Sequence, residues 1–192
     1  MIGCGALARE LAVVVRALPN VDVTCLRPDL HNRPERIVPA VREAIAAARP
    51  TYGDRIFVAY ADCGTGGLLD ELLDGEGVER LPGAHCYEFY AGARAFAAVA
   101  DEEPGTFYLT DFLIRNFDRL VWRGLGLDRH PELLDAYFGN YRRVVYLGQT
   151  EDPALVVQAH SAAARLGLTF EHRHVGLGDL ATAVHAFAGS IT

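Results

Sequence analysis

Three cysteines lie in short segments that follow predicted strands: Cys4 in GCGALA, Cys63 in YADCGTGG and Cys86 in GAHCYEF. A thiolate is both a nucleophile and a ligand for soft metals. Three converging thiolates leave one coordination position for a side chain, water or substrate. An open zinc site and a four-iron cluster with one accessible iron both have this form. We therefore predict one metal site built from Cys4, Cys63 and Cys86, with zinc favoured slightly over an iron–sulfur cluster because the chain has no C-x-x-C pair.

Acidic and imidazole side chains flank two of these cysteines. Asp62 precedes Cys63, and His85 and Glu88 surround Cys86. We expect His85 or Glu88 to complete the metal shell or to move protons, with Asp62 as a further catalytic group. A lone His or Cys is more often a packing or surface residue, but three such groups at one predicted helix start favour a site.

The loop after Cys63 is rich in glycine and leads into a helix. Its backbone N–H groups are suited to an anion, helped by the helix N-terminus. The residues predicted to bind the anionic group of a substrate or cofactor are Gly64, Thr65, Gly66 and Gly67. In the segment 29–36, His31 and Asn32 are further candidates for binding a carboxylate or phosphate. A capped, solvated helix start explains that segment equally well.

The first glycine-rich segment has a second interpretation. Gly3, Gly5 and Ala8 match the dinucleotide fingerprint G-x-G-x-x-A, with Asp29 as the ribose-binding acid. The fingerprint requires a preceding strand, and only residues 1–2 are available, so we expect the first strand to be shortened. The simpler alternative is a tight turn that holds Cys4 as a small buried residue. Cys25 lies within a predicted strand and is interpreted as a core residue.

Short apolar runs alternate with helical patterns along the whole chain. This alternation predicts an α/β fold: a single domain over residues 1–192, a Rossmann-like three-layer sandwich with a mainly parallel sheet. The predicted strands are 21–26, 55–61, 78–81, 106–109, 144–147 and 168–174. The predicted helices are 6–17, 34–48, 68–73, 87–100, 110–123, 131–138, 153–166 and 177–187. Because such sheets bind ligands outside the carboxyl ends of their strands, the cysteine segments lie where a site is expected.

Composition narrows the class of function. The net charge is −7 and all 18 basic residues are arginine, which argues against a nucleic-acid role and excludes lysine chemistry. We expect no membrane span, since no apolar run approaches the roughly 20 residues required. Four cysteines are too few for a disulfide scaffold, so we expect a cytoplasmic protein. The aromatic and charged segment 124–142 favours a homodimer.

Five segments together resemble a known family. In chain order, GCGALARE, LHNRPERI, YADCGTGG, GAHCYEF and YLTDFLIRNFDRLV resemble the family catalogued as domain of unknown function 1638, over Ile2 to about Pro153. The motif positions that carry over are Cys4, His31, Asp62, Cys63, His85, Cys86 and Glu88. The family brings no activity of its own. The association of some members with one-carbon and corrinoid methyl transfer implies a corrinoid protein or methyltransferase as a partner.

These features together predict a metal-dependent enzyme, a transferase or lyase, that acts on a small anionic or polar metabolite. A zinc-dependent thiol or methyl transfer and an iron–sulfur lyase both fit. One alternative is a non-catalytic metal or corrinoid accessory protein that uses the same thiolates. A second alternative is a Rossmann-type nucleotide-binding enzyme.

Overall fold

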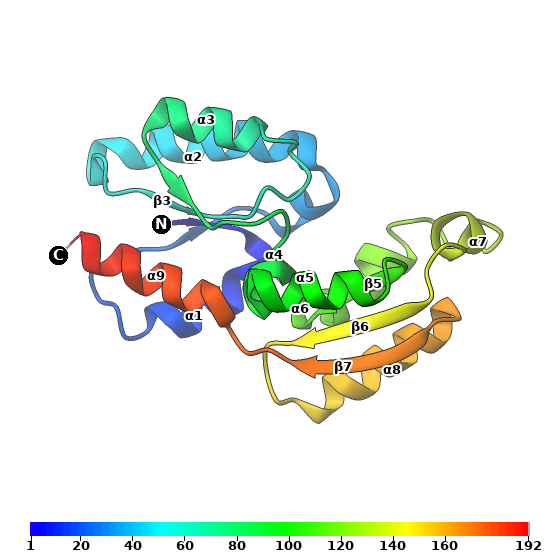
Figure 1. The fold of residues 1–192 in the computed structure, drawn as a ribbon. Helices are drawn as coiled ribbons and strands as arrows, with labels where there is room; N and C mark the ends of the chain where they lie inside the picture. Colours follow the sequence, from blue (N-terminus) through cyan, green and yellow to red (C-terminus); the bar gives the residue numbers. More distant parts are fainter. Residues whose placement is uncertain (192) are drawn as a thin grey trace. The chain divides into compact units, whose positions relative to one another are not determined.

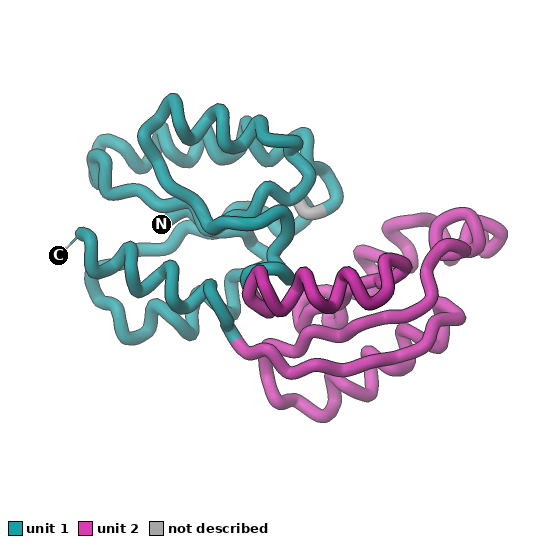
Figure 2. Tube along the Cα trace, viewed as in Figure 1, with its two compact units in different colours: residues 1–89, 177–192 teal, residues 90–176 magenta. Residues whose placement is uncertain are grey.

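The structure is a computed structural model that describes residues 1–191, except for the side chain of His31. The chain forms two compact units, residues 1–89 with 177–192 (unit 1) and residues 90–176 (unit 2), which Figure 2 distinguishes by colour. Each unit has its own parallel sheet flanked by helices (Figure 1), so the predicted α/β class is confirmed. The strands form two sheets where one was expected. A single domain over 1–192 stays a prediction, because the chain completes unit 1 only after it has passed through unit 2.

Unit 1 contains a four-stranded parallel sheet in the order β2-β1-β3-β4. The strands are β1 (Ile2–Gly3), β2 (Thr24–Cys25), β3 (Phe57–Ala59) and β4 (Glu79–Arg80). The helices are α1 (Ala8–Val15), α2 (Ile37–Tyr52), α3 (Leu68–Glu76), α4 (Cys86–Ala91) and α9 (Gly178–Ser190), with 3-10 turns at Gly5–Leu7, Pro28–Asn32 and Pro34–Arg36. Helices α2 and α3 cover one face of the sheet, and α1 and α9 cover the other (Figure 1).

The hydrogen-bonded strands of unit 1 are shorter than the apolar runs that predicted them. Residues 56–61 are all buried, as expected for a parallel strand covered on both faces, but only Phe57–Ala59 pair as a strand. β1 has two residues and pairs with both β2 and β3, so the expected short first strand lies inside the sheet. Because all four strands are parallel, the loops that follow them lie at one edge of the sheet.

Unit 2 contains a three-stranded parallel sheet in the order β5-β6-β7. The strands are β5 (Thr106–Thr110), β6 (Arg143–Gly148) and β7 (Thr169–His174). The helices are α5 (Ala93–Glu102), α6 (Asp111–Arg115), a π-helix (Asp118–Trp122), α7 (Leu133–Phe138) and α8 (Pro153–Leu166). Side chains alternate along β5: Leu109 belongs to the core cluster that α6 and α8 complete, whereas Tyr108 contacts Phe96 of α5 with ring centroids 4.9 Å apart.

Two of the predicted helices are interrupted. The predicted helix 87–100 is broken at Gly92, whose φ of 81° ends α4 before α5 begins. The predicted helix 110–123 starts as α6 and continues as the π-helix, so its second half has a wider turn. Within residues 1–191, no helix has the length and apolar character needed to cross a membrane.

Candidate functional site

The three predicted cysteine loops meet at the carboxyl edge of the unit 1 sheet. The Cys4 N–H donates to the Ala59 carbonyl at 3.2 Å, which joins the first loop to the end of β3. The Cys63 N–H donates to the Ala84 carbonyl at 2.8 Å, which joins the second loop to the segment before Cys86. Parallel pairing thus continues beyond the strands. It brings the three cysteine-bearing segments together, as the sequence predicted.

The three thiols are close enough to influence one another electrostatically. Burial, and after it the charge of Cys4, raises the pKa of Cys63 to about 12. Burial also raises the pKa of Cys86, with Cys63 and Cys4 acting in the same direction. The pKa of Cys4 is raised by burial as well. Near neutral pH all three are therefore thiols in this arrangement, and a metal that bound them as thiolates would release protons.

Tyr60 belongs to this cluster, although its apolar context in the sequence predicted only a core residue. Its side chain is buried, and its hydroxyl has no hydrogen-bond partner of ordinary geometry within the described residues. Burial raises the pKa of Tyr60, and the neighbouring Cys4 and Cys63 raise it further. The Tyr60 hydroxyl also interacts with the Cys4 thiol through a hydrogen bond of irregular geometry, so Tyr60 is part of the cluster.

Cys63 has a strained backbone. Its φ is 52°, and it is the only residue other than glycine with a positive φ in the part of the chain that the structure describes. A β-carbon in the left-handed region costs roughly 1–2 kcal/mol, and such strain is concentrated at functional sites. The sequence offers glycine at neighbouring positions but places a thiol here.

Because of this strain, Cys63→Gly is expected to be more stable to urea than Cys63→Ala, by about 1 kcal/mol in the free energy of unfolding. Both variants lack the thiol, so the difference reports the backbone alone. Cys4 provides the matched control, since its φ of −66° suits any residue. There, Cys4→Gly is expected to be less stable than Cys4→Ala. The same order of stability at both positions would contradict the strain at Cys63.

The glycine-rich loop is organised around Asp62. The Asp62 carboxylate accepts hydrogen bonds from the N–H groups of Gly64 (3.2 Å), Gly66 (3.1 Å) and Gly67 (2.9 Å), and from the Thr65 hydroxyl (2.6 Å). Burial alone would raise the pKa of Asp62, but these hydrogen bonds outweigh it and the pKa is lowered. In this structure the loop N–H groups predicted to bind the anionic group of a substrate or cofactor donate to the protein's own Asp62 carboxylate.

His85 and Glu88 lie at the start of α4 beside Cys86. The Glu88 carboxylate accepts a hydrogen bond from the Ala84 N–H at 2.8 Å, so it helps to hold the loop. Partial burial lowers the pKa of His85, whereas the charges of Glu88 and Asp62 act to raise it. His85 is therefore within electrostatic reach of both carboxylates. Of the three residues predicted to be catalytic, Asp62 and Glu88 accept hydrogen bonds that stabilise their loops. No such role is described for the His85 side chain.

Arg80 is a site residue that the sequence did not reveal. Its guanidinium forms two hydrogen bonds with Asp70 of α3, at 2.6 and 2.8 Å, and donates to the carbonyls of Leu81 and Gly83 at 2.6 and 3.2 Å. It thereby holds the chain that leads to Cys86. Its charge also acts to lower the pKa of Cys63. The sequence feature that could have identified Arg80 is its position at the end of β4, at the carboxyl ends of the strands where the cysteines lie.

The segment after β2 lies beside the first and second cysteine loops. A β-carbon built on Gly5 would be 2.3 Å from the Leu26 carbonyl oxygen, so this glycine permits a close approach within the chain itself. That contact accounts for Gly5 without a nucleotide. One built on Gly64 would be 3.4 Å from the Pro34 ring. Asn32 ends the 3-10 turn between these contacts and is exposed, whereas the predicted role of the His31 side chain falls outside the described residues.

The interpretation of Cys25 as a core residue is wrong. It lies in a strand, as predicted, but it is exposed, because β2 is at the edge of the sheet. Its sulfur lies near the end of β1, at 3.4 Å from where a β-carbon on Gly3 would be. The charge of Cys25 acts on the pKa of Cys4. Cys25 is thus a neighbour of the cluster on its exposed side.

Unit 2 has a buried polar network at the carboxyl ends of β5 and β6. The Asp111 carboxylate, 1% exposed, accepts hydrogen bonds from the Tyr146 hydroxyl at 2.7 Å, the Gln149 N–H at 2.9 Å and the Thr150 hydroxyl. The Gln149 side-chain oxygen accepts from the Asp111 N–H at 2.8 Å. Thr110 caps α6, its hydroxyl accepting a hydrogen bond from the Leu113 N–H.

The side chains of the cysteine cluster are not at the spacing of metal ligands in this structure. Among the side chains that the structure describes, no group of three from His, Cys, Asp and Glu stands close enough to hold a metal ion. The three thiols are therefore within electrostatic reach but wider apart than metal ligands would be.

Comparison with known protein families gives one match. The family model described as "Protein of unknown function (DUF1638)" matches residues 25–184. The chain belongs to the DUF1638 family. The match begins at Cys25, so the DUF1638 region includes Cys63 and Cys86, while Cys4 precedes it. It also extends beyond the predicted end at about Pro153, through most of α9. No curated protein and no solved structure matches the chain.

Proposed function

We propose that the edge of the unit 1 sheet binds a thiophilic metal through Cys4, Cys63 and Cys86, and that the chain uses it in a reaction on a small anionic or polar metabolite in the cytoplasm. The observation that carries the proposal is that backbone hydrogen bonds join the loops of these cysteines, which follow three different strands of one parallel sheet. Parallel sheets bind ligands outside the carboxyl ends of their strands, which is where these cysteines lie, Cys4 buried and the other two partly buried.

The donor set fits zinc or an iron–sulfur cluster. Thiolates with one imidazole are the ligands that soft and borderline metals prefer. His85 is the better fourth ligand, because the Glu88 carboxylate is already bonded to the Ala84 N–H. Since the thiols are not at ligand spacing, the proposal requires the cysteine side chains to turn toward one another when the metal binds. Tyr60 would then offer its hydroxyl to the bound metabolite.

The chemistry that such a metal supplies is activation of a thiol or water in the open position, or, for a cluster, binding of the substrate of a lyase reaction. Zinc is favoured because the cysteines form no C-x-x-C pair. The chain itself holds the thiols on short loops. Side-chain hydrogen bonds of Asp62, Arg80 and Glu88 to backbone groups stabilise these loops. His85 would accept or donate the proton beside the metabolite.

A specific observation favours a second candidate, a non-catalytic metal or corrinoid accessory protein. Asp62 and Glu88 are both engaged in loop hydrogen bonds, so neither of the two carboxylates predicted to be catalytic is free to act as a general base. Such a protein would pass its metal or corrinoid to a partner, for which a methyltransferase is the candidate. The two functions share the cysteine site and differ in whether the metal leaves it.

The test is anaerobic purification followed by elemental analysis and an absorption spectrum. We expect close to one equivalent of zinc in a colourless protein; iron and sulfide in a brown one would select the cluster. Metal that a chelator removes within minutes at neutral pH would favour the accessory protein. Metal-free protein whose thiols all react freely after incubation with zinc or with iron and sulfide would refute the site.

A further inference from the structure

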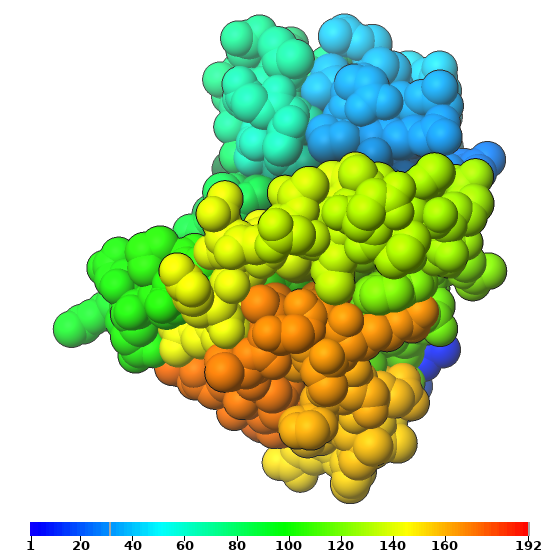
Figure 3. Space-filling view, turned by 90° about the vertical axis from the view of Figure 1, so that its right-hand side faces the viewer, coloured from blue at the N-terminus to red at the C-terminus, as the bar shows by residue number. Residues whose placement is uncertain are grey.

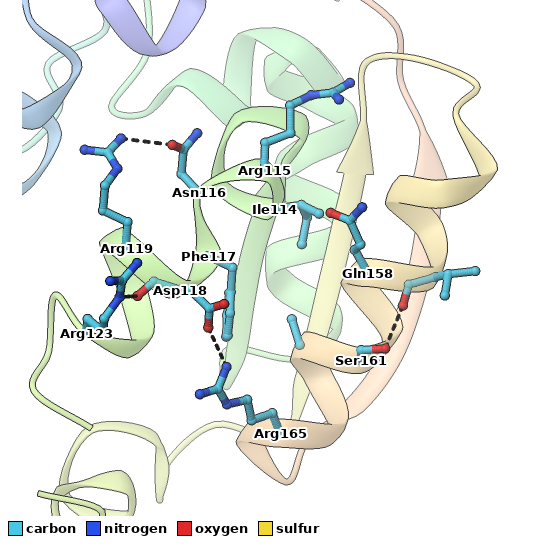
Figure 4. A pocket seen from close by; sticks show the side chains of 12 residues that line it. Ile114, Arg115, Asn116, Phe117, Asp118, Arg119, Arg123, Gln158, Ser161 and Arg165 are labelled. Atoms are coloured by element: carbon cyan, nitrogen blue, oxygen red, sulfur yellow. Dashed lines mark hydrogen bonds and ion pairs between the residues drawn. The ribbon is translucent and has the colours of Figure 1, made fainter. Parts of the chain in front are cut away.

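A cavity of about 550 Å³ opens on unit 2, between the segment from α6 to the π-helix and the facing side of α8. This volume is in the range of small-molecule sites. It is formed within residues 114–165 and contains no residue of the cysteine cluster. Figure 3 shows the segment between α6 and α7 (yellow-green) as a continuous part of the surface, and Figure 4 shows the cavity from close by.

The cavity is strongly cationic in a chain whose net charge is −7. Four arginines line it, and Asp118 is the one acidic residue among its lining residues. The four are Arg115, Arg119, Arg123 and Arg165. Three come from one side of the cavity and Arg165 comes from α8 on the other (Figure 4). An acidic protein that gathers four guanidinium groups around one hollow creates a local positive potential.

Two of the four arginines have no carboxylate partner within the described part of the chain. Asp118 pairs with Arg165. Arg119 donates to the Asn116 side-chain oxygen at 2.9 Å, and Arg123 donates to the Asp118 backbone carbonyl at 3.4 Å. Both acceptors are uncharged, and neither Arg119 nor Arg123 forms an ion pair with any carboxylate in the described part of the chain.

Arg115 is also incompletely paired. It lies 3.9 Å from the nearest carboxylate oxygens of Asp111 and Asp152, which is beyond hydrogen-bond distance. The Asp111 carboxylate already accepts three other hydrogen bonds. Arg119 and Arg123 are therefore the two guanidinium groups whose charge has no carboxylate partner in the described part of the chain.

The backbone and floor of the cavity indicate a built site. A π-helix is rare and is frequently found at functional sites, and here it carries Arg119 and leads directly into Arg123. The Arg165 guanidinium lies 3.7 Å from the centre of the Trp122 ring, which restrains it. The floor is apolar, because Ile114, Phe117 and Ala162 are buried there.

We propose that this cavity binds a small organic phosphate, with its phosphate on Arg119 and Arg123 and its apolar part against Phe117. A phosphate monoester carries two negative charges and three terminal oxygens, so it can accept hydrogen bonds from two guanidinium groups at once better than a single carboxylate does. The site is independent of the metal proposal, so either can fail without the other.

The test is isothermal titration of the full chain at low salt with phenyl phosphate, inorganic phosphate and benzoate. Phenyl phosphate is expected to bind at one site per chain and more tightly than the other two. The double variant Arg119→Ala with Arg123→Ala is expected to weaken binding at least about tenfold, because two charge-assisted contacts are lost. The matched control is Arg129→Ala with Arg142→Ala, which removes the same charge from exposed positions outside the cavity.

Each outcome bears on the proposal. Absence of phenyl phosphate binding, or equal weakening in both double variants, would overturn the site. Benzoate binding as tightly as phenyl phosphate would overturn the preference for phosphate. Inorganic phosphate binding as tightly would overturn the role of the apolar floor. Far-UV circular dichroism of the variants verifies that a loss of binding is not a loss of fold.

Discussion

Serine in place of Cys63 or of Cys86 is expected to lower the affinity for zinc at least about a hundredfold, because loss of a ligand exceeds the 10–100-fold cost of losing a group that only supports one. A serine hydroxyl stays protonated at neutral pH and is a poor ligand for a soft metal. Cys4→Ser is expected to have the same effect. The measurement is competition with a chromogenic zinc chelator, under anaerobic conditions, on protein reconstituted with zinc.

Cys25→Ser is the matched control for these variants. Cys25 is exposed on the edge strand, lies next to the cluster and is the chain's remaining cysteine, so its loss changes the thiol count equally. We expect it to retain zinc with the affinity of the unmodified chain. If the single variant Cys25→Ser lost zinc as Cys63→Ser is expected to, the three-cysteine set would be wrong. Retention of zinc by the Cys63, Cys86 and Cys4 variants would show that the thiols are not ligands.

The sequence predicted the bounds of an element well where it contains residues that both begin and end that element. The helix α8 spans the predicted range, 153–166, because Asp152 caps its first turn, Pro153 begins it and Gly167 ends it in the left-handed region. The strands of unit 1 were predicted too long, since buried apolar residues continue past the last paired residue. The division into two sheets had no local signal, because strand pairing depends on contacts that are distant in sequence.

The location of the candidate site was predictable from the cysteine loops, but the roles of its polar residues were not. Sequence placed Asp62 beside four anion-binding positions, and the structure shows that Asp62 itself occupies them. Which carboxylate fills a ring of N–H groups depends on backbone torsions, here on the positive φ at Cys63 and the glycines. The exposure of Cys25 likewise depends on strand order, since the same residue in β1 would be buried.

Asp111→Ala is expected to lower the free energy of unfolding of unit 2 by about 3–5 kcal/mol, the cost of removing one partner from a buried charged network. The substitution leaves the Tyr146 hydroxyl, the Gln149 N–H and the Thr150 hydroxyl without their acceptor. Each buried donor left unsatisfied carries a desolvation cost of its own. Urea denaturation followed by fluorescence measures this loss, because the chain's one tryptophan, Trp122, lies in unit 2.

Two further variants separate this network from a general effect of charge. Asp111→Asn keeps one acceptor oxygen, and the Thr150 hydroxyl can rotate to accept from the new amide, so a smaller loss of about 1–2 kcal/mol is expected. Asp101→Ala removes an exposed carboxylate from α5 of the same unit and should change stability by less than about 0.5 kcal/mol. If Asp111→Ala were no more harmful than Asp101→Ala, the network would contribute nothing to holding β5 and β6 together. The expected order, Ala well below Asn at position 111, follows because only the alanine variant removes both acceptor oxygens of this side chain.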